Sequence, residues 1–190
     1  MIRPQLLLAF FVIGSISCKK ENAGDPCSET TCLNGGTCVD GTCNCPIGYT
    51  GADCGAQVTP SLIRVHSITI TSFLAEPFEP WDVGSDPDLY AELTYGSNAQ
   101  FWQSPDTIHD AAPFHEYTFA VEPPLELMDT DGQYTLVLWD IDDSDRMWMG
   151  AVSFRFYDSL NDPHGGFPEV VTIESPGQLI TGRADITYEW

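Results

Sequence analysis

Aspartates crowd two short segments of this 190-residue chain. The segment WDIDDSD contains Asp140, Asp142, Asp143 and Asp145, and the earlier segment WDVGSDPDLY contains Asp82 and Asp88. Carboxylates this close repel one another unless water screens them or a cation lies among them. A donor set made only of oxygen suits calcium, which takes about six to eight oxygen ligands in irregular geometry, better than magnesium or zinc. Solvated acidic loops are the alternative interpretation.

Strands must position these aspartates, because each segment adjoins a run typical of a β-strand. Seven runs alternate apolar and polar residues or are rich in β-branched and aromatic residues, and helical periodicity is hard to find. Short strands separated by turn signals predict an antiparallel β-sandwich. Asp131-Gly132 predicts a tight hairpin, and Asp129 and Asp131 fit turn chemistry rather than a metal site. The expected strands cover residues 67–73, 89–95, 116–121, 134–139, 151–156, 169–173 and 184–190.

The spacing of the acidic loop excludes a helix-loop-helix calcium site. Counting from Asp140, the sixth position is Asp145 where glycine is required, and the twelfth is Ala151 instead of glutamate. If the two acidic segments open at one end of a sandwich, five or six carboxylates converge there.

The pattern around these aspartates resembles the C2 domain, a β-sandwich that often binds calcium and docks on phospholipid. The shared residues are D-x5-D-x-Y at Asp82, Asp88 and Tyr90, then V-x-W-D-x-D, then MGAVSF with Gly150 resuming a strand. The resemblance implies an antiparallel C2-like sandwich over residues 61–190. It also implies calcium as the cofactor, with Asp86 as an alternative to Asp88 and with Asp143 provisional, like Asp145. The implied ligands are Asp82, Asp88, Asp140, Asp142 and Asp145.

Six of the seven cysteines fall between residues 27 and 54, where spacing alone leaves 15 possible pairings. A segment this short cannot bury enough apolar surface to be stable without cross-links. Zinc is disfavoured, because Cys43 and Cys45 are too close for a zinc knuckle. The segment CSETTCLNGGTCVDGTCNCPIGYTGADC resembles the EGF-like domain. That resemblance implies disulfides joining Cys27 to Cys38, Cys32 to Cys43, and Cys45 to Cys54. Residues 55–60 have linker composition, and the module is expected to be a spacer that binds no calcium.

The N-terminus has the layout of an export signal, with Arg3, an apolar run and small residues before Cys18. Cys18 is the remaining one of the seven cysteines and is left without a disulfide partner. An exposed free thiol would react in an oxidising compartment, and lipidation would remove it. The junction resembles the bacterial lipoprotein signal, and SCKKE is similar to many lipoproteins of the Bacteroidetes. The resemblance implies a signal peptide over 1–17, lipidation of Cys18 and a tether over 18–26. The protein would then be membrane-anchored, facing the periplasm or the cell surface. An ordinary cleaved signal peptide is the alternative.

Composition restricts the partners. Twenty-eight acidic residues against seven basic ones leave little to bind nucleic acid, and phosphoinositide binding is disfavoured for the same reason. No nucleophile elbow or phosphate loop is present, so we expect no enzyme, and a hydrolase that uses His109 or His115 is the alternative.

Three functions remain open. The first is a lipid-anchored binding or adhesion protein whose sandwich holds calcium and whose partner is a protein or glycan at the cell surface. The second is a carbohydrate-binding sandwich in which Trp81, Trp102 or Trp148 stacks on sugar. The third is a hydrolase, which an Asp or Ser beside His109 or His115 would favour. An apolar tip formed by side chains near the acidic loops is a further expectation, from Phe78, Trp81, Met147, Trp148 and Met149.

Overall fold

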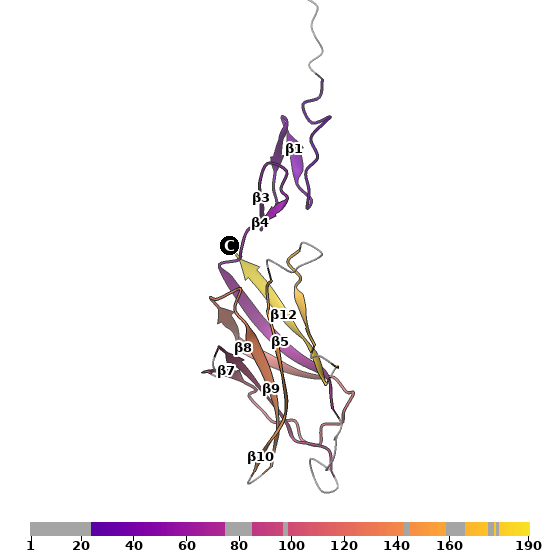
Figure 1. Ribbon diagram of the computed structural model, residues 1–190, viewed down its shortest axis with the longest axis vertical. Coiled ribbons are helices and arrows are strands. Elements are labelled where there is room, and N and C mark those ends of the chain that lie inside the picture. The colour runs from indigo at the N-terminus through magenta and orange to yellow at the C-terminus, as the bar shows by residue number, and fades with distance from the viewer. Residues whose placement is uncertain are drawn as a thin grey trace, which may run out of the picture.

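The computed structural model describes residues 24–74, 85–96, 99–142, 145–158, 166–174, 177 and 179–190. Within these residues the protein is built from strands, in a small N-terminal module followed by a larger sandwich (Figure 1). The fold class predicted from the sequence, all-β with a disulfide-rich module and an antiparallel sandwich, is confirmed.

The small module contains two pairs of short strands and three disulfides. Strand β1 (Thr37–Val39) pairs with β2 (Thr42–Asn44), and β3 (Tyr49–Thr50) pairs with β4 (Ala56–Gln57). The disulfides carry the pairing that the resemblance implies, Cys27 to Cys38, Cys32 to Cys43, and Cys45 to Cys54. Most side chains around them are exposed, so covalent links replace a hydrophobic core here.

Two four-stranded antiparallel sheets form the sandwich. One sheet has the order β10-β9-β6-β7 and the other the order β11-β12-β5-β8. The hydrophobic core lies between them, because alternate residues of each strand point inward, as in Tyr134, Leu136 and Leu138 of β9. The strands are β5 (Leu62–Phe73), β6 (Leu89–Tyr95), β7 (Ala99–Gln103), β8 (Tyr117–Leu127), β9 (Tyr134–Ile141), β10 (Arg146–Phe154), β11 (Val170–Glu174) and β12 (Ile180–Glu189).

The hairpin predicted at Asp131-Gly132 is wrong. A turn is present, since the Gly132 N–H donates to the Asp129 carbonyl at 3.1 Å, but it joins β8 to β9, which belong to different sheets. The physical reason is that β8 pairs with β5 and β9 pairs with β6 and β10, so both strands already have their partners. Turn residues indicated the reversal of the chain without indicating which sheet the next strand joins.

The segment that we expected to be a linker folds against the module. Ala56 and Gln57 form β4, and the Val58 N–H donates to the Gly48 carbonyl at 2.8 Å. The Trp190 indole N–H then donates to the Val58 carbonyl at 3.1 Å, and the Tyr157 hydroxyl contacts the Gln57 side-chain carbonyl at 3.1 Å. This segment is therefore held by hydrogen bonds both to the module and to the sandwich.

Aromatic rings fill the contact between the module and the sandwich, and we call this group the junction cluster. Tyr49 of the module lies edge-on to Phe167 at 5.4 Å between ring centroids, and Trp190 lies perpendicular to Phe167 at 5.0 Å. Gly48 sits beneath these rings with φ at 87°, and a Cβ there would lie 2.5 Å from the Phe167 ring. The members of the cluster are Tyr49, Tyr157, Phe167, Tyr188 and Trp190.

Tyr134 is a buried phenol close to the predicted turn. It is 2% exposed, and its hydroxyl donates to the Asp129 carbonyl at 3.0 Å. Burial, followed by the charges of Asp129 and Tyr95, raises the pKa of Tyr134 from 10.0 to about 12. The folded state therefore holds this proton at pH values where the unfolded chain has released it.

The unfolding free energy is therefore expected to fall as the pH rises from 10 towards 12. Below pH 10, Tyr134 is protonated in both the folded and the unfolded state, so its titration should cause no change in stability there. A tyrosine pKa raised to about 12 corresponds to roughly 2–3 kcal/mol of unfolding free energy lost across that window. Urea unfolding at pH 9, 10, 11 and 12 measures the loss. Tyr134→Phe is the control and should show a clearly smaller loss, so an equal loss in both proteins would contradict the assignment to Tyr134.

Candidate functional site

Asp88 and Asp140 meet at the ends of adjacent strands. Asp88 directly precedes β6, and Asp140 is the second-last residue of β9, where it is paired with Leu89 in register. Oδ1 of Asp140 accepts the Asp88 backbone N–H at 2.7 Å, and the Ile141 N–H donates to the Asp88 carbonyl at 3.0 Å. Asp140 is 0% exposed although it is a carboxylate. Asp88 and Asp140, one from each acidic segment, thus lie at the same end of the sandwich.

A neighbouring segment holds the Asp88 carboxylate in place. Residues 108–111 run beside the start of β6, where Ile108 and Leu89 exchange backbone hydrogen bonds of 2.9 Å. Asp88 Oδ2 lies 2.6 Å from His109 Nδ1, and Asp88 Oδ1 accepts the Asp110 N–H at 3.0 Å. Burial alone would raise the pKa of Asp88, but the hydrogen bonds from His109 and Asp110 and the nearby His109 charge together lower it below 3.8. The Asp88 carboxylate therefore stays ionised at neutral pH.

Asp142 and Asp145 lie in the turn that joins β9 to β10. The Asp142 N–H donates to the Asp145 carbonyl at 3.1 Å, and Asp145 Oδ1 accepts the Arg146 N–H at 2.8 Å. Three other predicted site residues, Asp82, Asp143 and the lipidation candidate Cys18, lie outside the described residues. Within the part of the chain that the structure describes, no three His, Cys, Asp or Glu side chains are grouped so as to hold a metal ion. We call the strand ends that carry Asp88, Asp140, Asp142 and Asp145 the acidic end.

The aromatic residues that we considered for binding take different positions. Trp102 is partly buried and packs against the core, with its ring 6.4 Å from Phe119. Trp148 is 58% exposed and Met147 is 41% exposed, both near the acidic end. Phe78 and Trp81 lie outside the described residues. Trp148 is therefore the described candidate for an apolar contact.

Sequence reasoning missed a polar group on the outer face of the β10-β9-β6-β7 sheet. Glu92 of β6 is only 8% exposed although it points away from the core. Its Oε2 accepts the Trp139 indole N–H at 2.9 Å and lies 2.6 Å from the Arg146 guanidinium. Alternation in each strand places all three side chains on one face of the sheet. Their contact could not be predicted, because it depends on the register in which β6, β9 and β10 pair.

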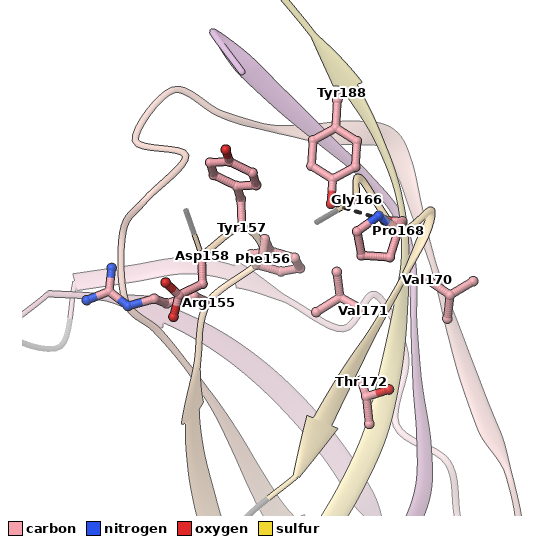
Figure 2. Close-up of a pocket in the computed structure, with 10 residues that line it drawn as sticks. All are labelled: Arg155, Phe156, Tyr157, Asp158, Gly166, Pro168, Val170, Val171, Thr172 and Tyr188. Carbon is pink, nitrogen blue, oxygen red and sulfur yellow. Dashed lines mark hydrogen bonds between the residues drawn. The ribbon is translucent and has the colours of Figure 1, made fainter. Parts of the chain in front are cut away.

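The sandwich also has a cavity of about 310 Å³ between the chain after β10 and strand β11 (Figure 2). Figure 2 shows Val171 directed towards Phe156, while Tyr188 reaches down from β12 and donates to the Pro168 carbonyl at 3.0 Å. None of the predicted site residues lines this cavity. Tyr157 and Tyr188 line it and also belong to the junction cluster, so it borders the contact with the N-terminal module.

Comparison with known proteins identifies the N-terminal module. Residues 27–53 match the sequence model of the EGF-like domain. The chain is therefore an all-β protein that contains an EGF-like domain followed by an antiparallel β-sandwich. A segment of 39 residues is 49% identical to the hepatocyte growth factor activator serine protease of Mus musculus. This match spans 17% of the present chain and only 6% of that protein.

Solved structures give weaker similarities. A C2 domain structure matches with a TM-score of 0.44 and 10% identity, over 68% of this chain and 98% of that one. Human GIVD cytosolic phospholipase A2 in complex with an inhibitor matches with a TM-score of 0.39 and 12% identity, over 67% and 17%. Extended-synaptotagmin 2 matches with a TM-score of 0.36 and 14% identity, over 69% and 27%. Similarity at this level carries no information about ligands.

Among the residues that the structure describes, no helix is long and apolar enough to cross a bilayer.

Proposed function

We propose that this chain is an exported binding protein, held at a membrane by a lipid on Cys18, in which the sandwich binds calcium at the acidic end. The observation that carries the calcium proposal is the meeting of Asp88 and Asp140, 52 residues apart in sequence, with Asp140 Oδ1 2.7 Å from the Asp88 N–H. A carboxylate buried as deeply as Asp140 is costly unless hydrogen bonds and an opposite charge compensate it. Calcium would supply that charge.

The donors at the acidic end have the carboxylate chemistry that calcium prefers, although no three of them are grouped within the described residues. Asp88, Asp140, Asp142 and Asp145 offer carboxylate oxygens, and Asp82 would complete the set. Each carboxylate oxygen has about two lone-pair positions, so the hydrogen bonds that Asp88 accepts leave capacity for a cation. These residues would hold the ion, which would screen the repulsion among their charges. His109 would keep the Asp88 carboxylate oriented towards it.

The position of the acidic end favours adhesion over docking on the anchoring membrane. The EGF-like domain lies at one end of the molecule, and the ends of β9 and β10 that carry the aspartates lie at the other (Figure 1). An anchor on Cys18 would place the EGF-like domain near the bilayer and direct the acidic end away from it. The partner that we propose is therefore a protein or glycan beyond the anchoring membrane.

Calcium is expected to raise the thermal midpoint of the chain with both domains, and chelator is expected to reverse the change. Ligand at a hundredfold its dissociation constant stabilises a protein by about 2.7 kcal/mol, which is several degrees for a domain of this size. Both domains are kept because β4 pairs with β3. Differential scanning calorimetry measures the shift.

The matched variants separate the acidic end from general charge effects. Asp140→Asn combined with Asp142→Asn should abolish the calcium-dependent shift. Asp129→Asn combined with Asp131→Asn, at the turn between β8 and β9, removes the same charge and should preserve it. The absence of a calcium-dependent shift in the parent protein would disprove the proposal.

A hydrolase is the lesser alternative, and one contact bears on it. Asp88 lies within hydrogen-bonding distance of His109, the arrangement that would favour such an enzyme. A triad also needs an activated serine or cysteine beside the imidazole. The six described cysteines are all in disulfides, and the sequence has no G-x-S-x-G elbow. We therefore propose binding as the role of this end.

A further inference from the structure

A groove crosses the outer face of the β10-β9-β6-β7 sheet, and its Arg146 and Trp148 side borders the acidic end. Its volume is about 490 Å³, within the roughly 300–1,000 Å³ of small-molecule sites. Both central strands, β6 and β9, are hydrogen-bonded on each side, so the floor of the groove is a complete sheet. The side chains that matter for its chemistry are Glu92, Gln100, Val137, Trp139, Arg146 and Trp148.

Glu92 forms a fixed polar centre in this groove. Its carboxylate receives the Trp139 indole N–H at 2.9 Å and the Arg146 guanidinium at 2.6 Å on Oε2. Among the described residues, Oε1 receives the longer contact from the Gln100 amide at 3.4 Å. Arg146 is itself stacked over the Trp139 ring, with its guanidinium carbon 3.7 Å from the ring centroid. Oε1 is therefore a preorganised acceptor that can take a hydroxyl hydrogen from a ligand.

Trp148 supplies an apolar platform beside that centre. It is paired with Trp139 across β9 and β10, which places it on the same face, and it is 58% exposed. Val137 and Ala151, also paired across these strands, add a small apolar floor. An exposed aromatic face next to fixed hydrogen-bonding groups suits a sugar ring, which presents C–H groups on its face and hydroxyls around its edge.

The charges and the backbone exclude other ligand classes. Arg146 is neutralised by Glu92, so the groove offers little to an anion, and the chain as a whole carries a formal net charge of −21. Glu92 is equally neutralised, which disfavours a cation. An extended peptide adds to a sheet edge, whereas the groove lies over paired central strands.

We propose that this groove binds a neutral glycan chain, with Trp148 stacking on a sugar ring and with the Glu92 carboxylate and the Gln100 side-chain carbonyl accepting hydrogen bonds from its hydroxyls. The groups that would bind the glycan differ from the carboxylates proposed to hold calcium, and binding needs no calcium. The proposal therefore stands or falls independently of the calcium site.

Affinity electrophoresis of the chain with both domains tests the proposal, using soluble β-glucan, mannan, xylan and galactan, with heparin as the anionic comparison, each run with and without chelator. At least one neutral polysaccharide is expected to retard the protein, and heparin is not. Trp148→Ala should weaken that binding at least tenfold with an unchanged thermal midpoint, because the side chain is largely exposed. Trp148→Phe, which keeps an aromatic face, should restore most of it.

Phe114→Ala is the matched control. Phe114 is 78% exposed and lines a different groove on the other sheet, together with Thr71 and Thr181. Its replacement should leave binding unchanged. The proposal is overturned if no neutral polysaccharide binds, if heparin is preferred, if chelator abolishes binding, if Trp148→Ala binds normally, or if Phe114→Ala causes an equal loss.

Discussion

Replacing Gly48 by alanine is expected to detach the EGF-like domain from the sandwich. The change should destabilise the contact between the two domains by about 2–5 kcal/mol. Left-handed backbone costs an L-residue about 1–2 kcal/mol, and Gly48 has φ at 87°. The new Cβ would also lie 2.5 Å from the Phe167 ring and 2.8 Å from the Trp190 ring. Overpacking of this kind costs about 1–3 kcal/mol. Urea unfolding followed by tryptophan fluorescence measures the change, because Trp190 lies at the contact.

Gly35→Ala isolates the backbone part of this effect. Gly35 lies in the same domain with φ at 79°, but a Cβ there would meet nothing within 4 Å. The Gly35→Ala variant should therefore lose only about 1–2 kcal/mol of unfolding free energy. In limited proteolysis it should not be cleaved between residues 55 and 61, whereas Gly48→Ala should be cleaved there. If the two variants lost the same stability and remained equally resistant to protease, the junction cluster would not be the tight contact that we describe.

Reduction of the disulfides is expected to unfold the EGF-like domain and to leave the sandwich folded. Removing one native disulfide from a small domain costs about 2–5 kcal/mol, and residues 27–54 have few buried side chains to offset that loss. The sandwich has its own core and no cysteine. Hydrogen exchange followed by mass spectrometry should show rapid exchange over residues 27–54 and retained protection in β5, β9 and β12.

Tryptophan fluorescence offers an internal control, because all five tryptophans lie after residue 80. Emission from the sandwich should keep its folded maximum under reducing conditions, with a limited change from Trp190. The double variant Cys45→Ala with Cys54→Ala should reproduce part of the effect without reductant. Cooperative loss of protection in β5 and β12 on reduction would contradict the independence of the sandwich.

Local patterns predicted the parts of the fold that depend on neighbouring residues. The disulfide pairing was implied by the resemblance to the EGF-like domain, and alternation located β6 and β9 to within a few residues. Strand β7 was missed because AQFWQ is short and contains two glutamines, Gln100 and Gln103, which are not typical of strands. The hairpin at Asp131-Gly132 failed because strand pairing is decided by the sheet as a whole and not by the turn.

The contacts at the candidate sites could also be predicted only in part. The approach of Asp88 to Asp140 was expected, since both aspartates adjoin strands and the family spacing relates them. The contact of His109 with Asp88 was not, because it depends on how the chain between β7 and β8 passes the start of β6. Glu92, Trp139 and Arg146 come from three strands, and each alone looks like an ordinary surface position.

The path of the chain from the EGF-like domain into β5 determines how the molecule would carry mechanical load. β5 starts at Leu62, beside the junction, and runs to Phe73, paired with β12 on one side and β8 on the other. Tension between the N-terminal end and the acidic end acts along this strand, so the ladder bonds on both sides resist it together in shear instead of opening one after another. The three disulfides limit the extension of the chain before β5 is reached. The molecule is thus suited to remain folded while pulled along its length.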